Sequence, residues 1–95
     1  MPEVTVTMTP FVRCPFLYQQ IMKLSEETGE VCKSFYEIDT MESGKINGDD
    51  ILHLMEECGD VIQTAVNIIT RCGYDVQEIM NRVTDKNLAR GYYAQ

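Results

Sequence analysis

Residues 21–31 read IMKLSEETGEV, and residues 51–61 repeat this phrase as ILHLMEECGDV. In each copy the apolar residues recur at helical spacing, which is typical of an amphipathic helix. Each copy also holds two carboxylates three positions apart, and such residues are neighbours on one face of a helix. The repeat therefore predicts two helices of the same kind, each carrying an acidic pair.

The helical periodicity extends beyond both copies and predicts two long helices. We expect the first over residues 16–39 and the second from Asp49, a good N-cap residue, to Gly73, which favours a helix end. A segment rich in turn-forming residues, 43–48, should be the loop between them. The apolar stripe of the first helix comprises Leu17, Ile21, Leu24, Val31, Phe35 and Ile38.

A third helix and an N-terminal arm complete the expected organisation. Asp75 and Glu78 have the spacing of a capping box, so a helix should follow them and end near Gly91. Residues 1–15 are expected to form an extended arm, because valine and methionine alternate with threonine near its start. Residues 16–95 should form a single all-α domain.

Charge and composition limit the classes of function. The chain has 95 residues, with 15 acids against 8 bases and a net charge of −7. An acidic surface disfavours binding to nucleic-acid polymers and to anionic membranes. No apolar run is long enough for a membrane span and no secretion signal is visible, so we expect a cytoplasmic protein. Reduced and mostly buried thiols are expected at Cys14, Cys32, Cys58 and Cys72, whose spacing fits no zinc or redox motif.

The two acidic pairs should meet across a helical hairpin. Helices joined by a short loop usually pack antiparallel. Glu30 lies about nine residues before the loop and Glu57 about eight after it, so both should lie roughly 12–14 Å from the turn. On the helical wheel, the first acid of each pair falls at the edge of the apolar stripe. The cluster formed in this way comprises Glu27, Glu30, Glu57 and Asp60.

Four converging carboxylates repel one another, and a hard divalent cation between them would relieve the repulsion. A single Glu-x-x-Glu pair is more often a solvated helix face. The repeat and the matched level of the pairs favour a metal site here. Gly29 and Gly59 add to this, because each costs roughly 1 kcal/mol relative to alanine in mid-helix. Either a ligand approaches the backbone beside these glycines or the helices cross closely there, and both explanations stay open.

The two acidic motifs resemble those of the MazG-like nucleoside triphosphate pyrophosphohydrolases. That all-α superfamily carries EExxE on one helix and ExxD on the next, which here are residues 26–30 and 57–60. The similarity covers residues 16–93. It implies a Mg²⁺-dependent hydrolase, with Mn²⁺ as a substitute ion. Such an enzyme cuts a nucleotide between its α and β phosphates and releases a nucleoside monophosphate and pyrophosphate.

The resemblance also implies a role for each matched residue. Glu27 and Glu30 match the metal ligands of the first motif. Glu57 and Asp60 match those of the second. Glu26 is the candidate to orient or deprotonate the attacking water, which makes the implied catalytic set Glu26, Glu27 and Glu30. The basic segment after the third helix implies the substrate-binding residues Lys86, Asn87 and Arg90, although positive charge at a helix C-terminus is also common without a ligand.

Three helices in so short a chain leave apolar faces uncovered. We therefore expect an all-α fold in which an antiparallel helical hairpin and a third helix complete a four-helix-type bundle by oligomerisation. A homodimer or homotetramer is expected, and the N-terminal arm is a candidate to cross to a neighbouring subunit.

Other functions stay open at this point. The chain could be a non-catalytic helical module that binds metal or nucleotide in a regulatory or scaffold role. A dimeric helical protein without any ligand is a simpler alternative. A phosphoribosyl-ATP pyrophosphatase-like activity, which belongs to the same superfamily, is a further one.

Overall fold

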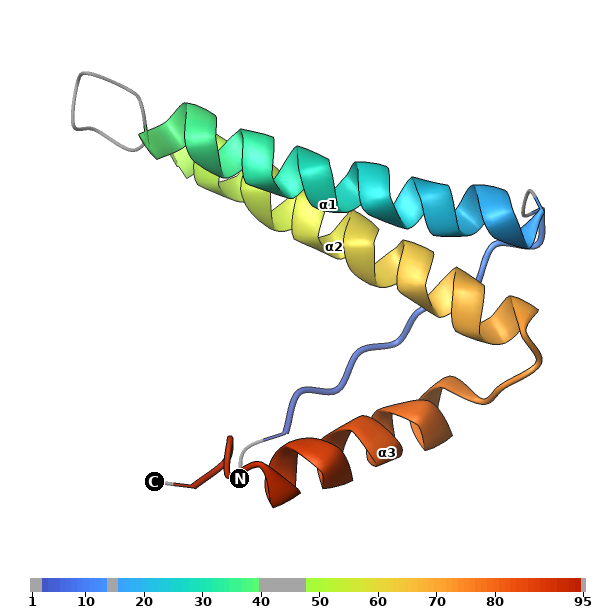
Figure 1. Ribbon diagram of the computed structural model, residues 1–95. Coiled ribbons are helices and arrows are strands. Elements are labelled where there is room, and N and C mark those ends of the chain that lie inside the picture. The colour runs from blue at the N-terminus through green and yellow to red at the C-terminus, as the bar shows by residue number, and fades with distance from the viewer. Residues whose placement is uncertain (1–2, 14–15, 40–47, 95) are drawn as a thin grey trace.

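The computed structural model describes residues 3–13, 16–39 and 48–94 (Figure 1). Within these residues the fold consists of α1 (Leu17–Asp39), α2 (Gly48–Arg71) and α3 (Val76–Ala89), with no strand. The prediction of an all-α fold with a helical hairpin and a third helix is confirmed. None of the helices in these segments combines the length and the apolar character that crossing a membrane requires.

Side-chain caps define where the helices start. Before α1, Gln19 Oε1 accepts a hydrogen bond of 3.0 Å from the Phe16 backbone N–H. Before α3, the Asp75 side chain accepts one of 3.0 Å from the Glu78 backbone N–H, as the capping-box spacing predicts. α2 begins one residue earlier than predicted, so Asp49 lies in its first turn and not at the N-cap. A negative charge in that turn is favoured by the helix dipole.

α2 and α3 end in the same way, at a glycine in the left-handed conformation. Gly73 has φ 84° and Gly91 has φ 79°, values that other residues rarely adopt. The Gly73 N–H donates to Thr70 O at 2.9 Å, and the Tyr74 N–H donates to Ile69 O at 3.2 Å. These bonds satisfy the last carbonyls of the helix. The predicted helix end at Gly73 is confirmed.

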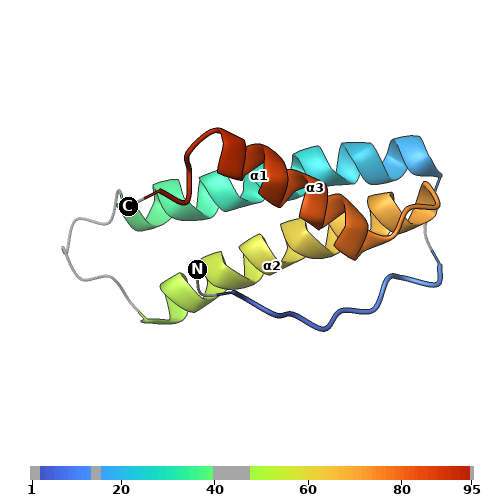
Figure 2. The same ribbon diagram turned by 90° about the horizontal axis from the view of Figure 1, so that it is seen from below.

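α1 and α2 lie side by side and antiparallel (Figure 1, Figure 2). On each helix the less exposed residues recur at spacings of three and four, the pattern of two packed helices. We call these two rows the seam. The row on α1 is Gln20, Leu24, Glu27, Val31, Ser34 and Ile38. The row on α2 is Asp50, Leu54, Glu57, Val61, Thr64 and Ile68.

The seam differs from the apolar stripe that periodicity predicts. No described apolar side chain is fully buried. The buried side chains are Gln20, Glu27, Ser34, Thr64 and Asn67. Leu17, Ile21 and Phe35 of the predicted stripe are 38%, 52% and 59% exposed. The hairpin packs through a row of alternating polar and apolar residues, so Glu27 lies inside the interface and not at its rim, where it was predicted.

α3 and the arm complete the described chain. α3 comes near α2 only beside the turn that connects them, diverges from it beyond that point (Figure 1), and makes no contact with α1. Residues 3–13 contain no helix or strand. The Phe11 backbone N–H donates to Asn67 Oδ1 at 3.0 Å, and Gln63 Nε2 donates to Thr9 O at 3.1 Å. The arm is therefore attached to α2 of its own chain, and a crossing to a neighbouring subunit stays a prediction.

The prediction of mostly buried cysteines is wrong for the cysteines that the structure describes. Cys32 and Cys72 are exposed and Cys58 is half-buried, and all three are free thiols. None of the three belongs to the seam, and Cys72 lies in the turn after α2. Cys14 and residues 43–47 of the predicted loop lie outside the described residues.

Candidate metal centre

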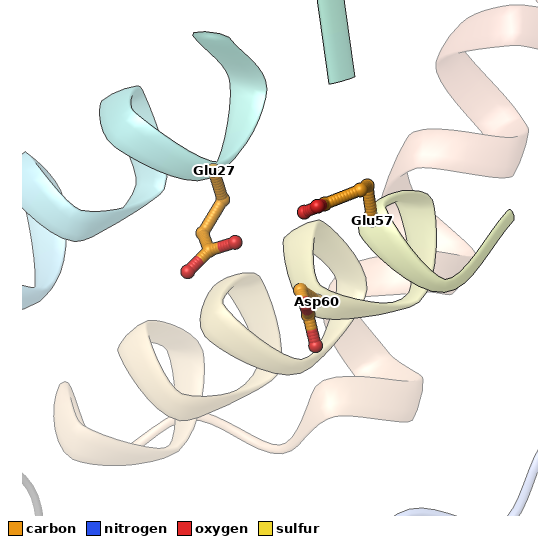
Figure 3. A group of neighbouring side chains, drawn as sticks. All are labelled: Glu27, Glu57 and Asp60. Carbon is orange, nitrogen blue, oxygen red and sulfur yellow. The ribbon is translucent and has the colours of Figure 1, made fainter. Parts of the chain in front are cut away.

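Three of the predicted carboxylates meet in the middle of the hairpin (Figure 3). Glu27 of α1 and Glu57 and Asp60 of α2 each place one oxygen within 4.8 Å of the other two. They come together because the two copies of the repeat lie at the same level of an antiparallel pair. Glu27 and Glu57 belong to the seam, and Asp60 follows one turn later on the α2 surface.

Glu30, the fourth predicted ligand, lies one turn beyond Glu27 and is exposed. Its pKa is raised above the ordinary value for a carboxyl group by the negative charge of Glu27 and by a hydrogen bond and charge from Glu57. Glu30 is therefore coupled to the cluster, although its carboxylate is not one of the three that converge.

Glu27 is the buried member of the cluster. Its side chain is only 8% exposed, and its Oε1 lies 3.1 Å from Lys23 Nζ. Its Oε2 is buried and has no hydrogen-bond partner among the described residues. A buried charged oxygen without a partner is unfavourable by about 1–3 kcal/mol or more. A bound cation would remove this penalty.

Each acidic motif has its own positively charged or titratable neighbour one turn earlier. Lys23 pairs with Glu27, and His53 Nε2 lies 3.0 Å from Glu57 Oε1. Lys23 and Glu27 form an i, i+4 pair, and the hydrogen bond to Glu27 raises the pKa of Lys23. The Lys23 contact offsets part of the negative charge of the cluster, so a cation that binds there competes with it.

An open cleft of about 580 Å³ adjoins the carboxylates. α1 and α2 line it, together with the N-terminal arm. Glu26, the residue predicted to act on water, lies on its wall with a side chain that is 64% exposed and 3.8 Å from Lys23 Nζ. Glu27 and Asp60 also line the cleft, which therefore joins the metal candidate to a space for a ligand.

The amide and arm residues of this cleft were not predicted from the sequence. Gln63 and Asn67 lie one turn apart on α2 and share a hydrogen bond of 3.0 Å. Phe11 and Arg13 line the cleft from the arm. Asn67 could have indicated them, because it is a polar residue within the apolar last turns of α2. A polar side chain at a buried position is more informative than an exposed apolar one.

The predicted substrate-binding residues lie away from this cleft. Lys86, Asn87 and Arg90 belong to the C-terminal end of α3, and no described residue of α3 lines the cleft. Within one chain the structure does not bring them to the carboxylates.

Neither explanation for the two mid-helix glycines is met within a single chain. At Gly29 and Gly59 no described atom other than those of the adjacent residues and of the helix's own backbone lies within 4 Å of the position that a Cβ would take. The helices therefore do not cross closely at these glycines, and nothing in the described chain approaches their backbone.

The donor set fits a hard divalent cation. Mg²⁺ and Mn²⁺ prefer carboxylate oxygens and usually keep several waters, so they need few protein ligands. Glu27, Glu57 and Asp60 supply such oxygens from two helices. The unpartnered Oε2 of Glu27 is an atom whose burial a cation would explain.

No protein-family model matches this chain, and comparison with curated proteins and with solved structures gave no match either. The chemistry of the site therefore has to be inferred from its own residues and geometry.

Proposed function

We propose that this chain is a cytoplasmic, Mg²⁺-dependent nucleotide pyrophosphohydrolase of the MazG-like type, which hydrolyses a nucleoside triphosphate between its α and β phosphates. The observation that carries the proposal is the buried, unpartnered oxygen of Glu27 beside the carboxylates of Glu57 and Asp60. The resemblance of the two motifs is the reason for choosing this reaction among those that use Mg²⁺.

In this proposal the cation is held by Glu27, Glu57 and Asp60, with Glu30 as the fourth ligand on the next turn. When bound, Mg²⁺ offsets negative charge on the phosphate oxygens and lowers the pKa of a coordinated water. Glu26 lies on the wall of the cleft, where its exposed carboxylate can orient the attacking water or accept its proton. Lys23 holds Glu27 in place through their ion pair at 3.1 Å.

The cleft suits a nucleotide in size and polarity. Its volume of about 580 Å³ lies within the range of roughly 300–1,000 Å³ that small-molecule sites occupy. The amide group of Gln20 lines it and offers a hydrogen-bond donor and an acceptor, while the amides of Gln63 and Asn67 hold the arm that forms part of its wall. A chain of net charge −7 can hold a polyphosphate because the cation reverses the local sign of the charge.

The proposal includes an oligomer, a homodimer or homotetramer that completes a four-helix-type bundle. The exposed apolar side chains support it, because apolar surface of this extent favours burial against another copy. On the hairpin they include Leu17, Ile21, Phe35, Ile51, Met55 and Ile62. Lys86, Asn87 and Arg90 stay the predicted phosphate-binding residues, to be brought to a cleft by the assembly.

The direct test is pyrophosphate release from a panel of the common ribo- and deoxyribonucleoside triphosphates with Mg²⁺ or Mn²⁺. We expect release from at least one of them and its loss in EDTA. Glu27→Gln and Asp60→Asn should each lower the rate at least about 100-fold, since even outer partners of metal ligands are worth 10–100-fold. Glu37→Gln is the matched control, because this α1 carboxylate is 63% exposed and pairs with Lys33 outside the cleft.

Calorimetry on the same proteins separates the alternatives. Binding of Mg²⁺ or nucleotide without turnover would favour the non-catalytic regulatory or scaffold module. A folded protein that binds no cation and hydrolyses nothing would be the helical protein without a ligand, and the proposed function would be wrong.

A further inference from the structure

The N-terminal arm forms one wall of the ligand cleft, through Phe11 and Arg13. Hydrogen bonds to side chains of α2 hold the arm in this position. The Phe11 N–H donates to Asn67 Oδ1 at 3.0 Å, and Gln63 Nε2 donates both to that oxygen at 3.0 Å and to Thr9 O at 3.1 Å. Asn67 is 2% exposed. Phe11, two residues before Arg13, is thus bonded to the most buried side chain that the structure describes.

Arg13 and Lys23 are the two cationic residues that line the cleft in the part of the chain that the structure describes. They differ in their surroundings. Lys23 is paired with Glu27 at 3.1 Å. For Arg13, no ion pair with a described carboxylate is formed. A guanidinium presents several N–H donors in a planar fork, which matches the oxygens of a phosphate better than an ammonium does.

A nucleoside polyphosphate needs such a group beside the metal candidate. It carries more negative charge than one divalent cation offsets, and the cleft is lined by the carboxylates Glu26, Glu27 and Asp60. Lys23 is already engaged by one of them. A cation supplied from the arm would balance the remaining phosphate charge.

We infer that Arg13 is a ligand-binding residue and that the arm acts as a clamp on the phosphates of a bound nucleoside polyphosphate. Arg13 contacts phosphate oxygens, while Gln63 and Asn67 are positioning residues that act through the arm. This inference rests on the proposed function, because the carboxylates that line the same cleft hold the cation of the same ligand.

The test measures KM and kcat of the full chain with Mg²⁺ and the nucleotide that the panel identifies. Arg13→Ala should raise KM at least about tenfold, the size expected when a hydrogen-bonded ion pair is lost. kcat should change less, and Arg13→Lys should restore part of the affinity. Arg82→Ala is the matched control, because Arg82 is an exposed arginine of α3 outside the cleft. It should leave both constants unchanged.

A second variant separates positioning from folding. Gln63→Ala removes the bond to Thr9 O but keeps the buried Asn67. Gln63→Ala should raise KM when it is the single substitution. It should have little further effect in the Arg13→Ala protein, because both changes remove the contact between Arg13 and the phosphates. Additive effects of the two substitutions would contradict the positioning role.

The outcomes distinguish the inference from the function on which it rests. Turnover by the wild-type chain, with KM and kcat unaltered in Arg13→Ala, would overturn the clamp and leave the proposed function in place. If the chain binds a nucleotide with Mg²⁺ but does not turn it over, calorimetry measures Kd instead, and Arg13→Ala should raise Kd by the same factor of about ten. A folded wild-type chain that neither binds nor hydrolyses any nucleotide of the panel would overturn both.

Discussion

At the scale of single residues, the two acids within each copy of the repeat lie in unequal surroundings. The Glu27 side chain is 8% exposed and that of Glu57 12%, whereas Glu30 and Asp60 lie on the surface. A buried carboxylate is unfavourable unless it is paired. Lys23 satisfies one oxygen of Glu27 and leaves the other without a described partner. Glu27 is therefore the residue whose position a bound cation would stabilise most.

Glu30 offers a test of the repulsion within the cluster. Its pKa is raised, first by the charge of Glu27 and then by Glu57. Because the folded pKa lies above the unfolded one, this group stabilises the fold fully below the ordinary carboxyl pKa. That stabilisation is lost as pH rises through the raised value. We predict that thermal unfolding in EDTA, followed from about pH 4 to 7, shows a decline of stability that Glu30→Gln reduces.

Mg²⁺ should restore stability at the upper end of that pH range in the wild type, because the cation replaces the proton. Glu37→Gln, on the same helix but outside the cluster, should follow the wild-type profile. If wild type and Glu30→Gln show the same dependence on pH, the coupling of Glu30 to the cluster would be refuted.

At the scale of helices, the sequence predicted the three helices, the cap at Asp75 and the helix end at Gly73, but not the start of α2 or the rotation of α1. The predicted apolar stripe and the observed seam share Leu24, Val31 and Ile38. Two rows that overlap in this way have nearly the same periodicity, and the choice between them depends on what packs against each. Sequence alone therefore predicted that the acidic pairs meet, while the burial of Glu27 required the packed hairpin.

The two mid-helix glycines give a prediction at this scale. Since no described atom beyond the adjacent residues and the helix's own backbone lies within 4 Å of an added Cβ, Gly29→Ala and Gly59→Ala should each stabilise the chain by about 1 kcal/mol through helix propensity. Chemical denaturation measures this directly. A loss of stability in either variant would instead show that another copy of the chain packs closely against that glycine.

At the scale of the whole molecule, a single chain leaves its apolar side chains without cover. No described apolar side chain is fully buried, and α3 comes near α2 only beside their connecting turn. Hydrophobic periodicity does not show which surfaces of the hairpin α3 and the arm contact. For this reason the cleft wall formed by Phe11 and Arg13, and the distance of Lys86 from the carboxylates, could not be predicted from the sequence.

We predict that the protein sediments as a dimer or tetramer of its 10.9 kDa chain. Ile21→Lys, at a site on α1 that is 52% exposed, should shift the population towards the monomer and lower the melting temperature, because the charge would be buried in the interface. Lys33→Ala, whose site is also exposed on α1, should do neither. A single species of 10.9 kDa at all concentrations would contradict the oligomer.

Binding of Mg²⁺ and Mn²⁺ to the nucleotide-free protein, measured by calorimetry, addresses the metal centre most directly. We predict a saturable site in the wild type that Glu27→Gln, Glu57→Gln and Asp60→Asn each weaken at least about 100-fold, while Glu37→Gln leaves it intact. A folded wild-type protein that takes up neither ion, or variants that bind it as tightly as the wild type, would contradict a cation held between the two helices.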